Sequence, residues 1–232
     1  MNRLDVVQHA LNQRCGRTYL EIGVKKGKVF LSVRARKKLA VDPVLKVSLK
    51  RKFRSWIRYP YNLLNEYFEL TSDDFFARYR DRLRRLQGLD VVFIDGLHTY
   101  EQTWKDVANS LEHLRPKGVI VMHDCNPATE AQATPADSRE HAHRMHAAPR
   151  AESWSGDVWK TIVRLRSERE DLCARVLDCD HGVGVITRGE PEERLGLTVR
   201  DIEAMAYADL QKNRVRLLGL HAPEELRMIL GG

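Results

Sequence analysis

The sequence has 232 residues and lacks any long apolar run, which limits the classes of protein it can represent. No stretch approaches the roughly 20 apolar residues that a membrane-spanning helix needs. The N-terminus, MNRLDVVQHALNQR, has neither an apolar core nor a small-residue cleavage signal, so it does not predict a secretory leader. Cysteine is scarce, since Cys15, Cys125, Cys173 and Cys179 are scattered and form no C-x-x-C pair. Reduced thiols in a cytoplasmic protein are the simplest expectation.

Acidic residues are almost absent from one part of the chain. Thirteen Lys or Arg lie between Lys25 and Arg58, where Asp42 is the only acid, and the net charge of the whole chain is +7. Such a block favours anionic partners, which include phosphorylated small molecules, nucleic acid and anionic membrane surfaces. The alternative is a solvated basic face without a partner.

Apolar runs that suit strands alternate with amphipathic, helix-like segments. The predicted strands are 18–24, 39–42, 66–70, 90–95, 119–124, 172–177 and 182–187. The first five alternate with helices and should be parallel, whereas the last two should form an antiparallel hairpin at one edge. The sequence therefore predicts an α/β fold with a Rossmann-like, doubly wound, seven-stranded sheet and helices on both faces.

Polar residues follow the predicted strands in the first half of the chain. Glu21 and Gly23 end the first strand, and Gly27 precedes a helix, which is where a backbone can approach a ligand. Asp42 lies about twenty residues further on, the spacing at which an acid can accept both hydroxyls of a ribose. The alternative for Asp42 is a simple strand-end turn before Pro43.

The stretch 89–124 holds two more buried strands with polar ends. One apolar run ends at Asp95, followed by His98, and the other ends in His123 and Asp124. Because open parallel sheets place their chemistry at the carboxyl ends of strands, these four side chains predict a site.

Together these segments resemble the class I S-adenosylmethionine-dependent methyltransferases. The resemblance is to the subfamily with an F-I-D-G-x-H-x-Y motif, here 93–100, and a G-D-V-W-K helix start, here 156–160. That subfamily is related to sugar and natural-product O-methyltransferases, and the resemblance covers roughly residues 15–188. It implies a methyltransferase domain over 1–189, in which 126–156 is a mobile lid loop. A helical extension, 190–232, would pack on the same domain or on a partner subunit of a homo-oligomer.

The resemblance also implies which residues bind S-adenosylmethionine. Gly23 and Gly27 would approach its methionine end, Glu21 its amino group, and Asp42 its ribose hydroxyls. Ser72, expected to cap a helix, and Asp73 would lie beside the adenine, and Asp95 would stand near the sulfonium. Lys25 and Lys26, between the two glycines, are expected to point to solvent.

For a hydroxyl acceptor, a general base must remove a proton. His98 is the first candidate and His123 the second, and the alternative for either is a hydrogen-bonded structural histidine. The strand-end residues Asp95, His123 and Asp124 are an alternative Mg²⁺ site, because related sugar O-methyltransferases bind magnesium through carboxylates there. In this chain, one expected carboxylate is histidine. The run of His141, His143 and His146 resembles a metal-binding tract or a solvated loop.

The leading hypothesis is O-methylation of a small-molecule hydroxyl, on a sugar or another natural-product-like acceptor. The basic block would attract such an acceptor if it carries negative charge. One alternative is a nucleic-acid methyltransferase, motivated by the same basic block, although no N-P-P-Y-type motif follows the fourth strand. Another is a non-catalytic cofactor-binding protein with the same fold. A dehydrogenase is disfavoured because G-x-G-x-x-G is absent.

Overall fold

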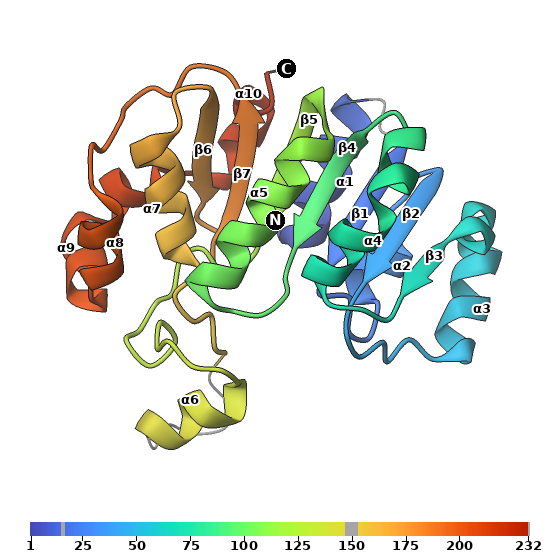
Figure 1. Ribbon diagram of the computed structural model, residues 1–232, viewed down its shortest axis with the longest axis horizontal. Helices are drawn as coiled ribbons and strands as arrows, with labels where there is room; N and C mark the ends of the chain where they lie inside the picture. Colours follow the sequence, from blue (N-terminus) through green and yellow to red (C-terminus); the bar gives the residue numbers. More distant parts are fainter. Residues whose placement is uncertain (15–16, 147–152, 232) are drawn as a thin grey trace. The chain divides into compact units, whose positions relative to one another are not determined.

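The computed structural model describes residues 1–14, 17–146 and 153–231 (Figure 1). The chain has two compact units. The N-terminal unit comprises Asn2–Gly96 and Lys105–Val121, and the C-terminal unit comprises Met1, Leu97–Trp104 and Met122–Gly232.

The N-terminal unit contains the parallel sheet that the sequence predicts. Its strands are β1 (Thr18–Ile22), β2 (Lys37–Val41), β3 (Glu66–Phe68), β4 (Leu89–Ile94) and β5 (Leu114–Met122), the last residue of which belongs to the other unit. They are hydrogen-bonded in the order β3-β2-β1-β4-β5. β1 pairs in parallel with β2 and with β4, and β2 pairs in parallel with β3. This is the strand order of a doubly wound α/β fold, so the predicted fold class is confirmed.

One helix precedes these strands and others connect them. They are α1 (Arg3–Gln13), α2 (Lys28–Ser32), α3 (Leu49–Arg58), the 3-10 helix η1 (Pro60–Leu64), α4 (Ser72–Arg85) and α5 (Tyr100–His113). The first five residues of α5 belong to the C-terminal unit. Every residue of β1 and β4 is buried, as expected for strands that are covered on both faces. The prediction that Ser72 caps α4 is wrong by one residue, because the Thr71 side chain accepts the hydrogen bond from the Asp74 amide.

The C-terminal unit contains the predicted hairpin and one strand more. β6 (Leu172–Leu177) pairs antiparallel with β7 (Val183–Arg188), which confirms the hairpin. The two-residue strand β8 (Leu220–His221) pairs in parallel with β6. Eight strands therefore form in the described ranges, where the sequence predicted seven. Two residues are too few to produce a hydrophobic period, so the pattern gave no sign of β8.

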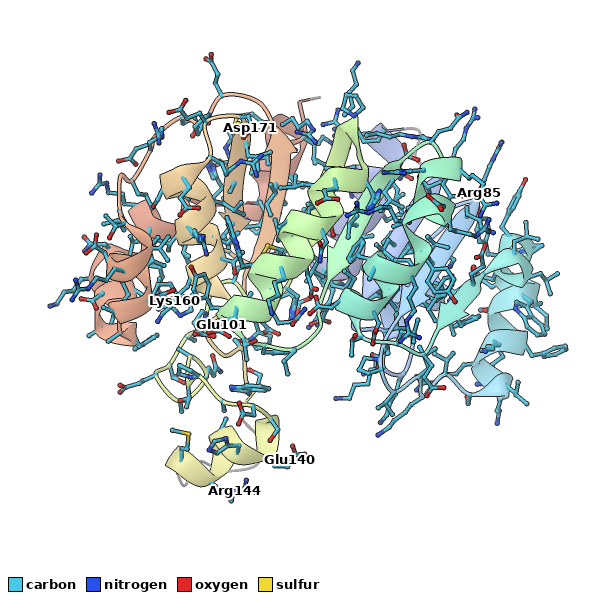
Figure 2. All side chains as sticks on the ribbon, in the orientation of Figure 1. Arg85, Glu101, Glu140, Arg144, Lys160 and Asp171 are labelled. Atoms are coloured by element: carbon cyan, nitrogen blue, oxygen red, sulfur yellow. The ribbon has the colours of Figure 1, made fainter. Side chains whose placement is uncertain are left out.

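Helices also complete the C-terminal unit. They are α6 (Arg139–His146), α7 (Trp159–Glu168), α8 (Val199–Ala204), α9 (Tyr207–Leu218), the 3-10 helix η2 (Pro223–Glu225) and α10 (Leu226–Ile229). Lys160, labelled in Figure 2, is buried in α7 and donates from Nζ to the Glu203 carbonyl oxygen of α8 at 2.9 Å. Burial lowers the pKa of Lys160, against the opposing charges of Asp157 and Glu203.

The predicted lid loop, 126–156, contains more regular structure than its composition suggests. The helix α6 lies within it, and Ala142 is buried there. Residues 147–152 of the predicted lid lie outside the described residues, and its mobility remains a prediction. Among the helices of the described residues, none has both the length and the apolar character that crossing a membrane requires.

Candidate functional site

Three of the predicted cofactor-binding residues lie at one edge of the N-terminal sheet. The register places Ile22 of β1 beside Val41 of β2 and Ile94 of β4. The residue after each strand continues the ladder: Gly23 N donates to Val41 O at 2.9 Å, and Asp95 N donates to Ile22 O at 2.9 Å. Gly23, Asp42 and Asp95 therefore share the carboxyl edge of the sheet, as the sequence predicts.

Gly23 is required by close packing at this edge. Its φ is +88°, and a Cβ there would lie 2.0 Å from the Asp95 carbonyl oxygen. No larger residue could bring the ends of β1 and β4 this close. Gly27, with a φ of +68°, precedes α2 as its N-cap residue.

The Asp42 carboxylate orders the glycine-containing loop. Its Oδ2 accepts from the Lys25 amide at 2.7 Å, and its Oδ1 accepts from the Val44 amide at 2.8 Å. These bonds are those of the strand-end turn that the sequence left open as the alternative role of Asp42. Lys25 and Lys26 are exposed, as expected.

Glu21 lies deeper than a ligand-contacting residue would, with a relative exposure of 2%. The Tyr19 hydroxyl donates to Glu21 Oε2 at 2.6 Å. Burial raises the pKa of Glu21 to about 8; the Tyr19 hydrogen bond and the charge of Lys38 oppose that rise, and the charge of Asp95 adds to it. Glu21 is therefore mainly neutral at pH 7.

Lys38, which belonged to the basic block in the sequence, is fully buried in β2. Its Nζ donates to the carbonyl oxygens of Phe30 and Val33, at 2.5 and 2.9 Å. Burial lowers the pKa of Lys38 to about 7 against the opposing effect of Glu21. Glu21 and Lys38 thus form a buried polar group that ties β1 and β2 to the helix after the glycine loop.

The remaining predicted cofactor residues of this unit differ in exposure. Asp95 is half-buried, and its Oδ2 accepts from Arg3 Nη1 of α1 at 3.0 Å. Ser72, the first residue of α4, is buried, and Asp73 after it is exposed. The sequence did not predict the contact between Arg3 and Asp95, because it joins residues 92 positions apart.

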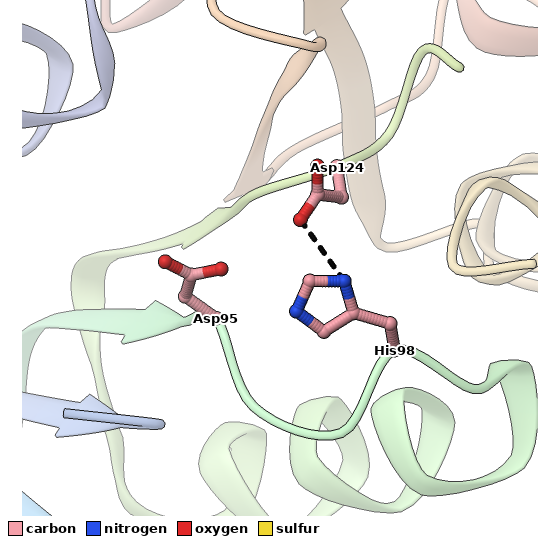
Figure 3. A group of neighbouring side chains, drawn as sticks. All are labelled: Asp95, His98 and Asp124. Carbon is pink, nitrogen blue, oxygen red and sulfur yellow. Dashed lines mark ion pairs between the residues drawn. The ribbon is translucent and has the colours of Figure 1, made fainter. Parts of the chain in front are cut away.

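In the C-terminal unit, three polar side chains surround the Asp124 carboxylate, and Figure 3 shows one of them, His98. It is 4% exposed and has a φ of +60°, which is uncommon for a residue other than glycine. Ser155 Oγ donates to its Oδ1 at 2.9 Å, and His98 Nδ1 lies 3.2 Å from its Oδ2. His123 Nδ1 lies 2.9 Å from the same Oδ2.

His98 is held in one orientation by the segment after α6. Its Nδ1 lies 2.9 Å from the Trp154 carbonyl oxygen, and its ring stacks on the Trp154 indole with centroids 5.0 Å apart. A carbonyl oxygen can only accept, so Nδ1 carries a proton. In neutral His98 the basic lone pair is then on Nε2.

His123 has a different electrostatic environment. Its Nε2 lies 2.7 Å from the Asp180 carbonyl oxygen, and its Nδ1 faces Asp124. Both nitrogens of His123 thus face oxygen atoms, and the ring pairs with the Asp124 carboxylate. Burial acts to raise the pKa of Asp124, but the hydrogen bond and charge of His123, with His98 and Ser155, outweigh it and lower that pKa.

The G-D-V-W-K segment supports His98 from the other side. Asp157 Oδ1 accepts from the Tyr100 amide at 2.7 Å and so caps the start of α5, two residues after His98. Burial raises the pKa of Asp157 against this hydrogen bond. Trp154 and Ser155 were missed as site residues, although a tryptophan in a segment of small residues was an available signal.

The predicted metal residues are divided by the fold. Asp95, also drawn in Figure 3, follows β4 in the N-terminal unit, whereas Asp124 belongs to the C-terminal unit. The magnesium site therefore remains a prediction. In the histidine run, His141 Nδ1 lies 3.7 Å from the exposed Asp137 carboxylate, and the side chains of His143 and His146 lie outside the described part.

Comparison with known proteins gives the class of the domain. Residues 20–125, just under half of the chain, match a family model described as a methyltransferase domain. The matched range begins within β1 and includes β2, β3, β4 and β5 and the residues that follow them. No curated protein sequence is similar enough to count as a match.

Two solved structures illustrate the similarity of fold. A Staphylococcus aureus protein with a provisional assignment as a caffeoyl-CoA O-methyltransferase has a TM-score of 0.55 at 14% identity, over 80% of this chain and 82% of that one. The S-adenosylhomocysteine-bound methyltransferase PaMTH1 of Podospora anserina has a TM-score of 0.52 at 15% identity, over 81% of this chain and 78% of that one. Both share the α/β Rossmann-like methyltransferase fold.

Proposed function

We propose that this protein is an S-adenosylmethionine-dependent O-methyltransferase that acts on a small-molecule hydroxyl. The methyltransferase-domain match and the fold shared with an S-adenosylhomocysteine-bound methyltransferase support the reaction class. The observation that carries the choice of a hydroxyl acceptor is the placement of His98, whose Nδ1 donates to the Trp154 carbonyl oxygen and leaves the basic lone pair on Nε2.

The residues at the carboxyl edge of the N-terminal sheet fit such a cofactor. Asp42 is held by two backbone amides, and each carboxylate oxygen has a second lone pair with which to accept a ribose hydroxyl. The loop from Gly23 to Gly27 would face the methionine end, and Ser72 and Asp73 the adenine. Asp95 would favour the positive sulfonium. S-adenosylmethionine supplies the methyl group, and these side chains bind and orient.

His98 would remove the acceptor proton through Nε2. Asp124 favours the imidazolium that forms, because its carboxylate lies 3.2 Å from Nδ1. His123 would act as a positioning residue, since it pairs with Asp124 on the other side. Glu21 would act indirectly rather than by contact with the cofactor, because its side chain is buried. We keep magnesium at Asp95 and Asp124 as a proposal for diol acceptors.

The test combines cofactor binding with methyl transfer. Calorimetry with S-adenosylhomocysteine should give a 1:1 complex. Asp42→Asn should weaken this complex at least tenfold, because the side-chain NH₂ of asparagine would face one of the two backbone N–H groups that donate to the Asp42 carboxylate. Asp81→Asn, at an exposed residue of α4, is the matched control and should bind as the wild type does. Absence of binding in the wild type would contradict the proposal.

The acceptor class is tested separately, with methyl-labelled cofactor and panels of sugars, nucleotide sugars and phenols, in magnesium and in chelator. Transfer to a hydroxyl supports the proposed reaction. Transfer only to amines or to RNA would overturn it. A rate that chelator abolishes and magnesium restores would support the metal site, and an unchanged rate would exclude it.

A further inference from the structure

The helix α3 has an amphipathic pattern with its apolar side turned outward. Leu49, Phe53 and Ile57 recur every fourth residue and so share one face. Their relative exposures are 79%, 59% and 70%. A surface helix of a globular protein normally buries this stripe, so the arrangement needs a physical explanation.

The opposite face of α3 makes the contacts with the rest of the N-terminal unit. Ser55, roughly 160° around the helix from Phe53, is buried, and Asn62 Nδ2 donates to its carbonyl oxygen at 3.2 Å. Arg51 Nη1 donates to the Lys26 carbonyl oxygen at 2.8 Å. These polar contacts fix which way α3 faces, so the apolar stripe is exposed while α3 is held in place.

Other exposed apolar residues lie in the chain on either side of α3. In η1, Leu63 and Leu64 are more than half exposed, and so is Val44 before α3. We call this set, with the stripe of α3, the outer apolar face. Single exposed apolar residues are common, but several on adjacent short elements mark an interaction surface.

The charge around the outer apolar face is of one sign. Lys50, Arg54 and Arg58 are exposed and recur every fourth residue along one flank of the stripe. Residues 43–65 contain no Asp or Glu. A symmetric contact between two copies of this chain would set this cationic flank against itself, which disfavours self-association.

We propose that α3 and η1 dock the protein on anionic lipid membranes, with the outer apolar face inserted at the level of the headgroups. A cationic helix with an apolar stripe suits this interface, because its charges meet anionic headgroups and its stripe leaves water. The phosphate backbone of a nucleic acid would pair with the cationic flank, but such contacts are electrostatic and would leave Leu49 and Ile57 in water. This inference stands independently of the proposed methyl-transfer reaction.

Sedimentation with lipid vesicles tests the proposal. The full-length protein should bind vesicles that contain phosphatidylglycerol and should bind phosphatidylcholine vesicles at least tenfold less. Phe53→Glu/Ile57→Glu should abolish binding. Its matched control is Val215→Glu/Met228→Glu, at exposed apolar residues of α9 and α10, which should bind as the wild type does. Equal loss in both variants would overturn the assignment of the surface.

The cationic flank is tested by Lys50→Gln/Arg54→Gln/Arg58→Gln, which should lower the partition coefficient by about 100-fold. Arg200→Gln/Lys212→Gln/Arg227→Gln removes the same charge from other exposed positions and should have little effect. Circular dichroism confirms that each variant is folded. Three results would overturn the proposal: no binding to anionic vesicles, RNA binding that needs the cationic flank but survives Phe53→Glu/Ile57→Glu, or a concentration-dependent dimer that this variant dissociates.

Discussion

Gly156 lies so close to His98 that a Cβ at position 156 would sit 1.8 Å from the His98 carbonyl oxygen. The residues on either side of Gly156 serve the same group: Trp154 accepts from the His98 ring, Ser155 donates to Asp124, and Asp157 caps the helix after His98. One short segment thus fixes the backbone, the ring and the carboxylate partner of the proposed general base.

Gly156→Ala should therefore be far more harmful than its size suggests. The φ of Gly156 is +62°, and the new methyl group would collide with backbone that cannot move without displacing His98. We expect a loss of about 3–5 kcal/mol in the free energy of unfolding and a large loss of turnover. Urea denaturation and methyl-transfer assays measure the two effects.

Gly196→Ala is a closely matched control, because Gly196 has a φ of +67° and no atom within 4 Å of the added Cβ. It should cost only about 1 kcal/mol, from backbone strain alone. Equal losses in the two variants would show that the contact with His98 is unimportant.

Asp124→Asn tests the buried ion pair with His123. Asparagine tolerates the left-handed backbone of position 124, so the change removes the charge and little else. Leaving His123 without its counter-ion should cost about 3–5 kcal/mol at pH 7, whereas Asp178→Asn, at an exposed residue of the same unit, should cost less than about 1 kcal/mol. Chemical denaturation measures the free energy of unfolding of both variants. A loss for Asp124→Asn as small as that for Asp178→Asn would mean that no ion pair is present.

The pH dependence of Asp124 has a definite sign. Because its pKa in the folded protein is lowered, its contribution to stability is present above its ordinary value of 3.8 and is lost as the pH falls through the folded pKa. The wild type should therefore lose stability below about pH 4 relative to Asp124→Asn. Denaturation of both proteins from pH 7 to 3 measures this loss, and a difference that stays constant with pH would exclude it.

Glu21→Gln should stabilise the protein increasingly as the pH rises from 5 to 7. Burial raises the pKa of Glu21 from 4.5 to about 8, so folded Glu21 keeps a proton that the unfolded chain releases. The free energy of unfolding of the wild type then falls by up to about 1.4 kcal/mol per pH unit relative to the variant. The pKa of Lys38 is lowered to about 7, so above pH 7 this residue makes the free energy of unfolding rise with pH. The comparison is therefore restricted to pH 5–7. A pH-independent difference would show that Glu21 is ionised.

The strand ends could be predicted from the sequence because hydrophobic runs determine where buried strands stop. The runs before Asp95 and His123 place the polar residues at the edge of a parallel sheet, whatever the loops do. Glycine spacing predicted that the backbone at Gly23 approaches a ligand, whereas the neighbour that requires glycine there in the structure is Asp95, 72 residues away.

Other features depend on tertiary contacts that no local pattern contains. Lys38 appeared to belong to a solvated basic block, but β2 begins earlier than predicted and buries it against carbonyl oxygens of the α2 segment. The ring nitrogens of His98 and His123 face the Trp154 and Asp180 carbonyl oxygens, at sequence separations of 56 and 57. The sequence offered both histidines as bases, and only the hydrogen-bond partners distinguish them.

The most direct test of the central claim is single-turnover methyl transfer by His98→Gln at saturating S-adenosylmethionine, with calorimetric affinity for S-adenosylhomocysteine measured in parallel. His141→Gln in α6 is the control. If Nε2 of His98 removes the acceptor proton, His98→Gln slows transfer by about 10²–10⁴-fold, while cofactor affinity and the control change little. Transfer by His98→Gln at the wild-type rate would contradict the claim.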